Sequence, residues 1–173
     1  LPDTHKNREI DGYQGYASGN KFVAEGLPLN TFLMPKYAGV DKTNGLPMWY
    51  KDILGDDGEV IGTTMTSEYS EATEYLCDDP TPKLYGGFGT SFNFYNFDIS
   101  AAFTYSIGGL TYDSGYASYM SPPGGTVGSN FHRDVLKAWT PENKDSDIPR
   151  FVYQDQNINA SSDRFLVPAS YLN

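Results

Sequence analysis

The sequence predicts an all-β fold built from antiparallel strands. The first observation is a strict alternation of apolar and polar or small residues in "FGTSFNFYNFDISAAFTYSIGG", residues 88–109. A period of two indicates strands, because successive side chains of a strand point to opposite faces. The second is a tight turn at Tyr95-Asn96, which joins two alternating runs into a hairpin. The third is that the connections on either side of this hairpin are long, from roughly Ala38 to Pro82 and from roughly Gly109 to Asp163.

The elements before the hairpin follow from local patterns. Residues 1–20 are polar and turn-rich, and residues 21–37 read as one extended strand. Pro28 and Pro35 favour an edge-like or bulged form of that strand, since proline cannot donate to a sheet ladder. Residues 38–82 form a long loop, in which Asn44-Gly45 and Asp57-Gly58 predict small hairpins. The run "SEYSEATEYLC" has a short helical pattern with serine at a plausible N-cap.

The main hairpin is expected over residues 83–108. A long irregular segment follows over residues 109–163, with a short helix expected between Asn130 and Trp139. Residues 164–173 alternate weakly and predict the start of another strand.

The two faces of the hairpin differ in character. One face carries Phe97, Ile99, Ala101, Phe103, Tyr105 and Ile107, and the other carries Asp98, Ser100, Ala102, Thr104 and Ser106. In a soluble β-sandwich the apolar face is the inside, whereas in an outer-membrane barrel it faces lipid. Long structureless connections count against a compact sandwich, and tight turns on one side with long loops on the other are the rule in such barrels. The pattern therefore favours a segment of a transmembrane β-barrel with long extracellular loops, and a soluble carbohydrate-binding β-sandwich remains the alternative.

Composition narrows the function classes. The 173 residues carry 12 Lys and Arg against 22 Asp and Glu, a formal net charge of −10. The basic residues are scattered, which argues against a nucleic-acid partner. No run reaches the roughly 18 apolar residues of a spanning helix, but this does not exclude barrel strands, which alternate. The single cysteine, Cys77, excludes an internal disulfide and a thiolate metal cluster.

No catalytic or cofactor site is indicated. His5 and His132 lie far apart in sequence, and no nucleophile triad, paired-carboxylate signature or phosphate loop is recognisable. The stretch "DILGDDGE" gathers Asp52, Asp56, Asp57 and Glu59, yet it lacks the ligand spacing of a calcium loop. We interpret it as a solvated hairpin tip and expect no enzyme activity, cofactor or metal.

Four ordered motifs resemble a known family. "YAGVDKTNGLPMWY", "YGGFGTSFNFYNFDISAAFTYSIGGLTYDSGYA", "LKAWTPENKDSDIPRF" and "SSDRFLVPASYL" are similar to successive late-barrel segments of SusC/RagA-like TonB-dependent outer-membrane transporters. The resemblance runs from about Phe22 to the C-terminus, and its order makes it more specific than any single motif.

The resemblance implies a barrel of about 22 strands with a plugged lumen, in the outer membrane of a Gram-negative bacterium. It implies import of oligosaccharides or peptides, a SusD-like surface lipoprotein as partner, and energy from TonB. Neither the plug nor the TonB box is present in this sequence, so TonB would bind a part of the parent protein outside this chain. Because the sequence starts without a signal peptide and stops within an expected strand, we expect a piece of a larger protein.

Within this frame residues 1–20 are expected to form a turn region on the periplasmic side, and residues 38–82 and 109–163 to be extracellular loops. The residues of the hairpin between these loops also acquire expected roles. Phe97, Ile99, Phe103, Tyr105 and Ile107 are expected to face outer-membrane lipid, and Asp98, Ser100, Thr104 and Ser106 the wet lumen. A hydrated lumen removes the cost of burying Asp98 in a soluble core. Phe92, Phe94, Tyr95 and Phe97 gather at the short turn, where a periplasmic aromatic girdle belongs.

Six aromatic residues in the two long loops are candidates for substrate or partner contact. They are Trp49, Tyr50, Tyr112, Tyr116, Tyr119 and Trp139. Aromatic faces can stack on sugar rings or anchor a protein interface. The alternative, which we favour, is that they pack the loops onto one another.

Overall fold

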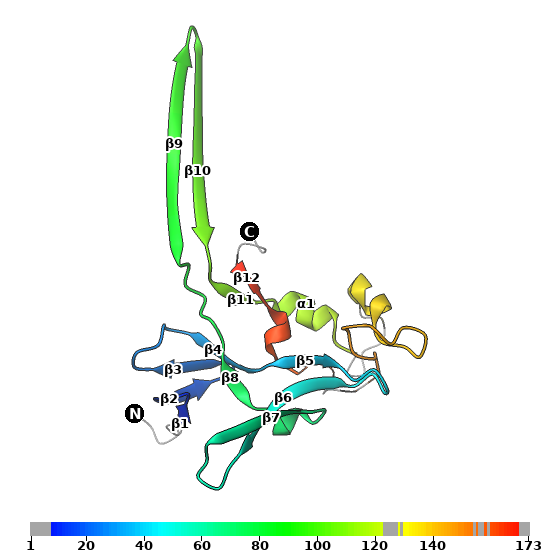
Figure 1. The fold of residues 1–173 in the computed structure, drawn as a ribbon. Coiled ribbons are helices and arrows are strands. Elements are labelled where there is room, and N and C mark those ends of the chain that lie inside the picture. Colours follow the sequence, from blue (N-terminus) through cyan, green and yellow to red (C-terminus); the bar gives the residue numbers. More distant parts are fainter. Residues whose placement is uncertain are drawn as a thin grey trace.

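The computed structural model describes residues 8–122, 128, 130–153, 155, 158 and 160–169. Antiparallel strands dominate it, and they form a body from which one long hairpin projects (Figure 1). In the part of the chain so described, no helix has the length and apolar character needed to cross a membrane. The expectations for residues 1–7 and 170–173 lie outside the described residues.

The first sheet holds five strands in the order β1-β2-β3-β4-β8. Their bounds are β1 Arg8–Ile10, β2 Tyr13–Ser18, β3 Lys21–Ala24, β4 Thr31–Pro35 and β8 Glu74–Leu76. Asp11 and Gly12 join β1 to β2, with φ of 51° and 81°. Positive φ at both central residues matches the hairpin turn that best fits strand twist. Residues 8–20 are therefore regular β-structure and not an irregular turn region.

The expected single strand over residues 21–37 is wrong. Its residues contribute to three strands, because β3 ends at Ala24, β4 begins at Thr31 and β5 spans Tyr37–Val40 in another sheet. The edge position is also wrong, since β4 lies between β3 and β8 and all its residues are buried. Pro35 is tolerated there because it is the last residue of β4, where its missing N–H interrupts the ladder least.

The second sheet has the order β5-β6-β7, with β6 spanning Pro47–Leu54 and β7 spanning Val60–Thr66. Asn44-Gly45 lies in the turn between β5 and β6, and Asp57-Gly58 in the turn between β6 and β7, where sequence predicted hairpins. The helical pattern that follows gives only the single 3₁₀ turn η1, Tyr69–Glu71, before the chain enters β8. The region expected as loop thus contains strands of two sheets.

The projecting hairpin consists of β9, Leu84–Phe94, and β10, Phe97–Ile107. Its register runs without a bulge from Phe97 opposite Phe94 to Ile107 opposite Leu84. Figure 1 shows the turn at the far end, away from the body. Among the described residues, β9 and β10 pair with each other alone.

Short elements close the base of the hairpin. Strand β11, Leu110–Tyr112, pairs with β12, Leu166–Pro168, and so brings together the two ends of the second long loop. Helix α1, Ser114–Tyr119, is capped by Asp113, whose carboxylate accepts a 2.8 Å hydrogen bond from the backbone N–H of Tyr116. The helix expected between Asn130 and Trp139 is the 3₁₀ segment η2, Arg133–Lys137, and another 3₁₀ turn, η4, spans Asp163–Phe165.

Two groups of buried residues stabilise the body. Phe22, Phe32, Leu33, Met34 and Trp49 are buried among the two sheets. Ala117, Met120 and Phe165 form a second cluster around α1, with Tyr112 and Tyr116 packed against it. Each large buried side chain contributes roughly 1.5–3 kcal/mol, so the body is held by its own core while the hairpin is not.

Candidate functional site

The register of the hairpin sorts its side chains onto two faces. Residues directly opposite each other share a face, so Phe88, Phe92 and Phe94 join the apolar residues of β10. The second face carries Tyr85 at the base of the hairpin and otherwise small or polar residues: Gly87, Gly89, Ser91 and Asn93 from β9, and Asp98, Ser100, Ala102, Thr104 and Ser106 from β10. The hairpin is therefore amphipathic across its whole length.

Within the described part of the chain, the apolar face of the hairpin is left largely exposed. Phe88, Ile99 and Phe103 are 64%, 62% and 52% exposed. The stacked pair Phe88 and Phe103, with ring centroids 5.0 Å apart, still leaves both rings open to the surroundings. A soluble β-sandwich requires these residues to pack against a second sheet, and the hairpin instead stands clear of the body (Figure 1).

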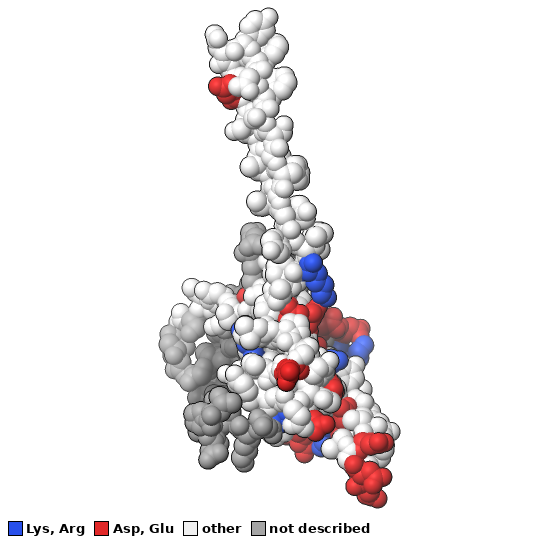
Figure 2. Space-filling view, turned by 90° about the vertical axis from the view of Figure 1, so that its left-hand side faces the viewer, with Lys and Arg blue, Asp and Glu red and all other residues white. Residues whose placement is uncertain are grey.

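The hairpin has the dimensions of a membrane-spanning element. Each strand has 11 residues, and at about 3.3 Å per residue this gives roughly 36 Å. A tilt of about 45°, usual for barrel strands, reduces the height to roughly 26 Å, close to the apolar band of an outer membrane. Figure 2 shows the hairpin as an almost uncharged surface with one acidic residue near its tip, whereas charges gather over the body.

That acidic residue is Asp98, the one charged residue between Leu84 and Ile107. It lies on the polar face opposite Asn93, and the amide of Asn93 donates a hydrogen bond to its carboxylate. At the turn, Phe94 meets Tyr95 edge-on with ring centroids 4.6 Å apart, and Tyr95 is 89% exposed. Aromatic rings and a short turn therefore occupy the same end of the hairpin.

The candidate contact residues in the first loop have different environments. Trp49 is 1% exposed and meets Tyr69 edge-on at 5.3 Å between centroids. A ring so deeply buried cannot stack on a substrate or partner, so Trp49 is a core residue and its assignment as a contact is wrong. Tyr50, the next residue of β6, is exposed on the opposite face of the strand.

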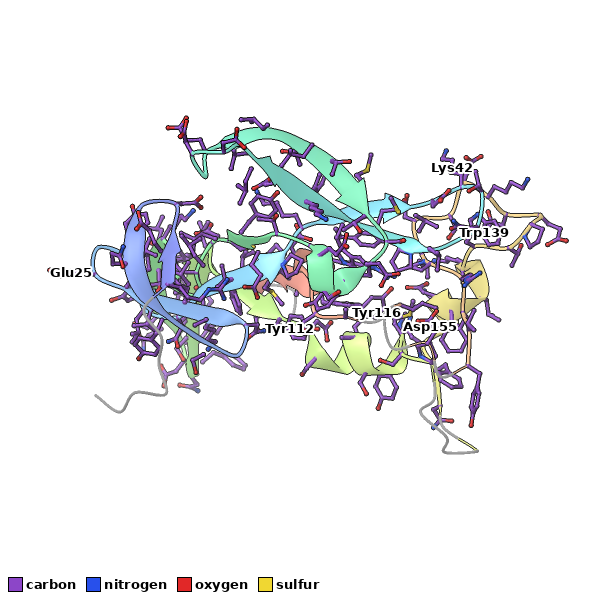
Figure 3. All side chains as sticks on the ribbon, turned by 90° about the horizontal axis from the view of Figure 1, so that it is seen from below. Glu25, Lys42, Tyr112, Tyr116, Trp139 and Asp155 are labelled. Carbon is purple, nitrogen blue, oxygen red and sulfur yellow. The ribbon has the colours of Figure 1, made fainter. Side chains whose placement is uncertain are left out.

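Tyr112 and Tyr116 pack against the core around α1. Both rings meet Phe165 edge-on, at 6.0 Å and 6.2 Å between centroids. The hydroxyl of Tyr116 donates a 3.2 Å hydrogen bond to Asp134, and its ring contacts His132. Burial and the neighbouring carboxylate of Asp134 raise the pKa of Tyr116. Figure 3 labels both tyrosines beside α1, with Trp139 at one end of the body.

Trp139 joins the two long loops. Its indole N–H donates a 3.3 Å hydrogen bond to the carbonyl of Lys42, and the Lys42 ammonium pairs with Asp145 at 2.6 Å. The backbone N–H of Arg150 donates a 2.9 Å hydrogen bond to the carbonyl of Gly45. Figure 3 shows Lys42 and Trp139 side by side at this end of the body. Tyr119, by contrast, is 54% exposed on α1.

The body also contains a cleft of about 730 Å³. One wall is β1 with the turn after it, the second is η1 with β8, and the third is the β6–β7 hairpin. The lining includes Arg8, Glu9, Ile10, Asp11, Asp52, Leu54, Val60, Tyr69, Glu74 and Tyr75. Sequence reasoning missed this site, because its walls come from segments expected as turn, strand and loop.

Two contacts order the cleft. The guanidinium of Arg8 pairs with Glu74 at 2.8 Å, which ties β1 to β8. The hydroxyl of Tyr75 donates a 2.5 Å hydrogen bond to Asp52 on β6. Desolvation, together with this hydrogen bond, raises the pKa of Tyr75 to about 12, so the hydroxyl remains protonated at neutral pH. Within the described residues, no three His, Cys, Asp or Glu side chains are placed to hold a metal ion.

Comparison with known proteins relates this chain, with its amphipathic hairpin, to TonB-dependent transporters. The chain resembles a segment of a TonB-dependent transporter of the SusC/RagA-like kind. It is 27% identical over 156 residues to the TonB-dependent receptor P3 of Formosa agariphila, an alignment that covers 88% of this chain and 15% of the receptor. No family model matches the chain.

Solved structures agree with this resemblance. The chain is 28% identical to the RagAB peptide importer in its open-open state, with a TM-score of 0.68 over 94% of this chain and 17% of that one. For the RagAB peptide transporter the identity is 26% and the TM-score 0.62, over 91% and 18%. The chain thus spans less than a fifth of the relatives that it matches. These relatives are described as a receptor, a transporter and an importer.

Proposed function

We propose that this chain is part of the wall and outer surface of an outer-membrane TonB-dependent active transporter. In this proposal β9 and β10 cross the outer membrane, and the body forms two of the large extracellular loops. The single observation that carries the proposal is the exposed hairpin, whose apolar face and small, polar face run along 11 residues of each strand. Lipid would cover the first face, and the lumen would hydrate the second.

The orientation follows from the turn. A two-residue connection at Tyr95-Asn96 suits the periplasmic side, and the body then lies outside the cell. The strands β1 to β4 belong to this body (Figure 1), so residues 8–37 would lie on the extracellular side. The expected periplasmic position of residues 1–20 is therefore replaced, for residues 8–20, by an extracellular one.

The whole protein would be a barrel of about 22 strands that contains a plug and takes its energy from TonB. A SusD-like lipoprotein would cover the extracellular face. Two solved neighbours are described as a peptide transporter and a peptide importer, which supports peptides ahead of oligosaccharides as cargo. Tyr50 and Tyr119 are the exposed candidates for partner contact, whereas Trp49, Tyr112, Tyr116 and Trp139 serve the structure of the loops.

Sidedness tests this proposal in the full-length protein on intact cells. The lone Cys77 is first replaced by serine, and single cysteines are then placed by Asn96→Cys at the hairpin turn or Asp57→Cys at the β6–β7 tip. A membrane-impermeant maleimide should label the cysteine at position 57 on intact cells, and the one at position 96 only after the outer membrane is permeabilised. Labelling of both positions on intact cells would contradict the proposal.

A further inference from the structure

We propose that the cleft between β1, β8 and the β6–β7 hairpin binds an extended peptide that carries lysine or arginine side chains. This inference rests on the proposed function and names a cargo class for it. It is carried by three independent properties of the cleft: open strand edges, excess negative charge and size.

The two edge strands of the first sheet meet at this cleft. Among the described residues, β1 pairs with β2 alone and β8 pairs with β4 alone, so each presents one open edge. Arg8 and Glu9 of β1 and Glu74 and Tyr75 of β8 all line the cleft. Open edges offer unpaired backbone N–H and C=O groups, to which an extended peptide can add as a further strand. An oligosaccharide cannot reproduce that ladder.

The charge of the cleft favours a cation. Its lining holds four carboxylates, from Glu9, Asp11, Asp52 and Glu74, and a single basic group, Arg8. The ion pair between Arg8 and Glu74 neutralises one of them, which leaves an excess of three negative charges. These groups would attract a basic side chain and repel an acidic one.

The tyrosines add a surface for such a side chain. Tyr69 and Tyr75 both line the cleft. The ammonium of Lys36 lies 4.7 Å from the ring centroid of Tyr75 and already makes the cation–π contact of that ring, which leaves Tyr69 as the lining ring for a peptide cation. The volume of about 730 Å³ lies in the range of small-ligand sites, and the three residues of β1 span roughly 10 Å. Only a short stretch of peptide would be held.

Binding to the purified full-length protein tests the proposal. The probes are a heptapeptide that alternates lysine with threonine, the same peptide with glutamate in place of lysine, and a neutral oligosaccharide of similar length. The lysine peptide should bind at least tenfold more tightly than either of the other probes. Methylation of alternate backbone nitrogens should abolish its binding, because it removes the donors that pair with a strand edge.

Matched variants locate the binding site. Glu9→Gln with Asp11→Asn removes two charges from the cleft, whereas Asp56→Asn with Asp57→Asn removes two from the β6–β7 tip outside the lining. Asparagine suits the positive φ of residue 11, and glutamine keeps an acceptor for the 2.5 Å hydrogen bond from Gln14. The cleft variant should weaken the lysine peptide about tenfold and the tip variant less than twofold.

Three results would overturn the inference. They are equal affinity for the lysine and glutamate peptides, equal loss of affinity in the two double variants, and tighter binding of the oligosaccharide. None of these results bears on the maleimide labelling at positions 57 and 96, so failure of the peptide site and failure of the transporter assignment remain distinguishable.

Discussion

The carboxylate of Asp163 accepts a 2.7 Å hydrogen bond from the backbone N–H of Tyr37, 126 positions earlier in the chain. The hydroxyl of Tyr37 in turn donates a 3.0 Å hydrogen bond to the carbonyl of Asp147. The start of the first long loop is thereby fixed to two points of the second. Together with the contacts of Trp139, these bonds make one structural unit of two loops that are separated in sequence by the hairpin of β9 and β10.

Asp163→Ala should loosen this unit, because the N–H of Tyr37 loses its acceptor while partly buried. The cost is about 1–3 kcal/mol in the local opening free energy, measured by hydrogen exchange at the amide of Tyr37 in the full-length protein. Asp163→Asn is the matched control, since it keeps an acceptor oxygen and should cost less. Equal protection in wild type and in the alanine variant would show that the bond is dispensable.

The burial of Asp163 also predicts that the stability of this unit depends on pH. Burial raises the pKa of Asp163 above its ordinary value, so the folded state holds its proton to higher pH than the unfolded state does. The contribution of Asp163 to stability is therefore largest below its ordinary pKa of about 3.9 and is lost as pH rises through the folded value. The opening free energy of wild type minus that of Asp163→Asn should fall as pH rises from 4 to 7, and a rise would contradict this sign.

Gly45→Ala should separate the two loops at the Trp139 contact. A Cβ at position 45 would lie 2.4 Å from Cε3 of the Trp139 ring, and the φ of 75° adds backbone strain. Gly58→Ala is the control, because its φ of 80° is similar and nothing lies within 4 Å of its Cβ. Overpacking should cost Gly45→Ala about 1–3 kcal/mol more than the control, read from exchange of the amides over residues 138–150.

Trp49→Ala and Tyr50→Ala should differ in their effect on stability, because Trp49 is a core residue and Tyr50 lies on the surface. The first removes a fully buried side chain and should cost about 3–5 kcal/mol, whereas the second removes a partly exposed ring and should change stability by less than about 1 kcal/mol. Hydrogen exchange across β6 measures both effects on stability.

If Tyr50 contacts the SusD-like lipoprotein, Tyr50→Ala should also reduce recovery of that partner in a pull-down from detergent extracts.

Ile99→Arg and Ser100→Arg should differ in their effect on assembly of the barrel in the outer membrane, although the two residues are neighbours in sequence. An arginine on the lipid face of a barrel strand costs about 2–4 kcal/mol near the bilayer centre, while one on the lumen face remains hydrated. Ile99→Arg should therefore reduce the amount of folded protein in the outer membrane, and Ser100→Arg should not. Folded barrel is quantified by its heat-modifiable migration in gels.

The hairpin could be predicted from sequence because the alternation in each of its two strands and the short turn between them are local signals. The division of residues 21–37 into separate strands could not be predicted, since Gly26 and Asn30 adopt positive φ and interrupt the extended run. The burial of β4 depends on its pairing with β8, about 40 residues later. Asp11-Gly12 carries the same type of turn signal as Asp57-Gly58 and could have identified the first hairpin. The cleft could not be read from sequence, because three distant segments form its walls.

The most direct test of the account uses the adjacent residues Ala101 and Ala102, which have the same side chain but lie on opposite faces of β10. Each is replaced by cysteine in the full-length protein without Cys77 and carries a nitroxide spin label in a lipid bilayer. Collisions with lipid-soluble oxygen should dominate at position 101, and collisions with a water-soluble nickel complex at position 102. Equal accessibility at both positions, or the reverse order, would contradict the assignment of lipid and water to the two faces.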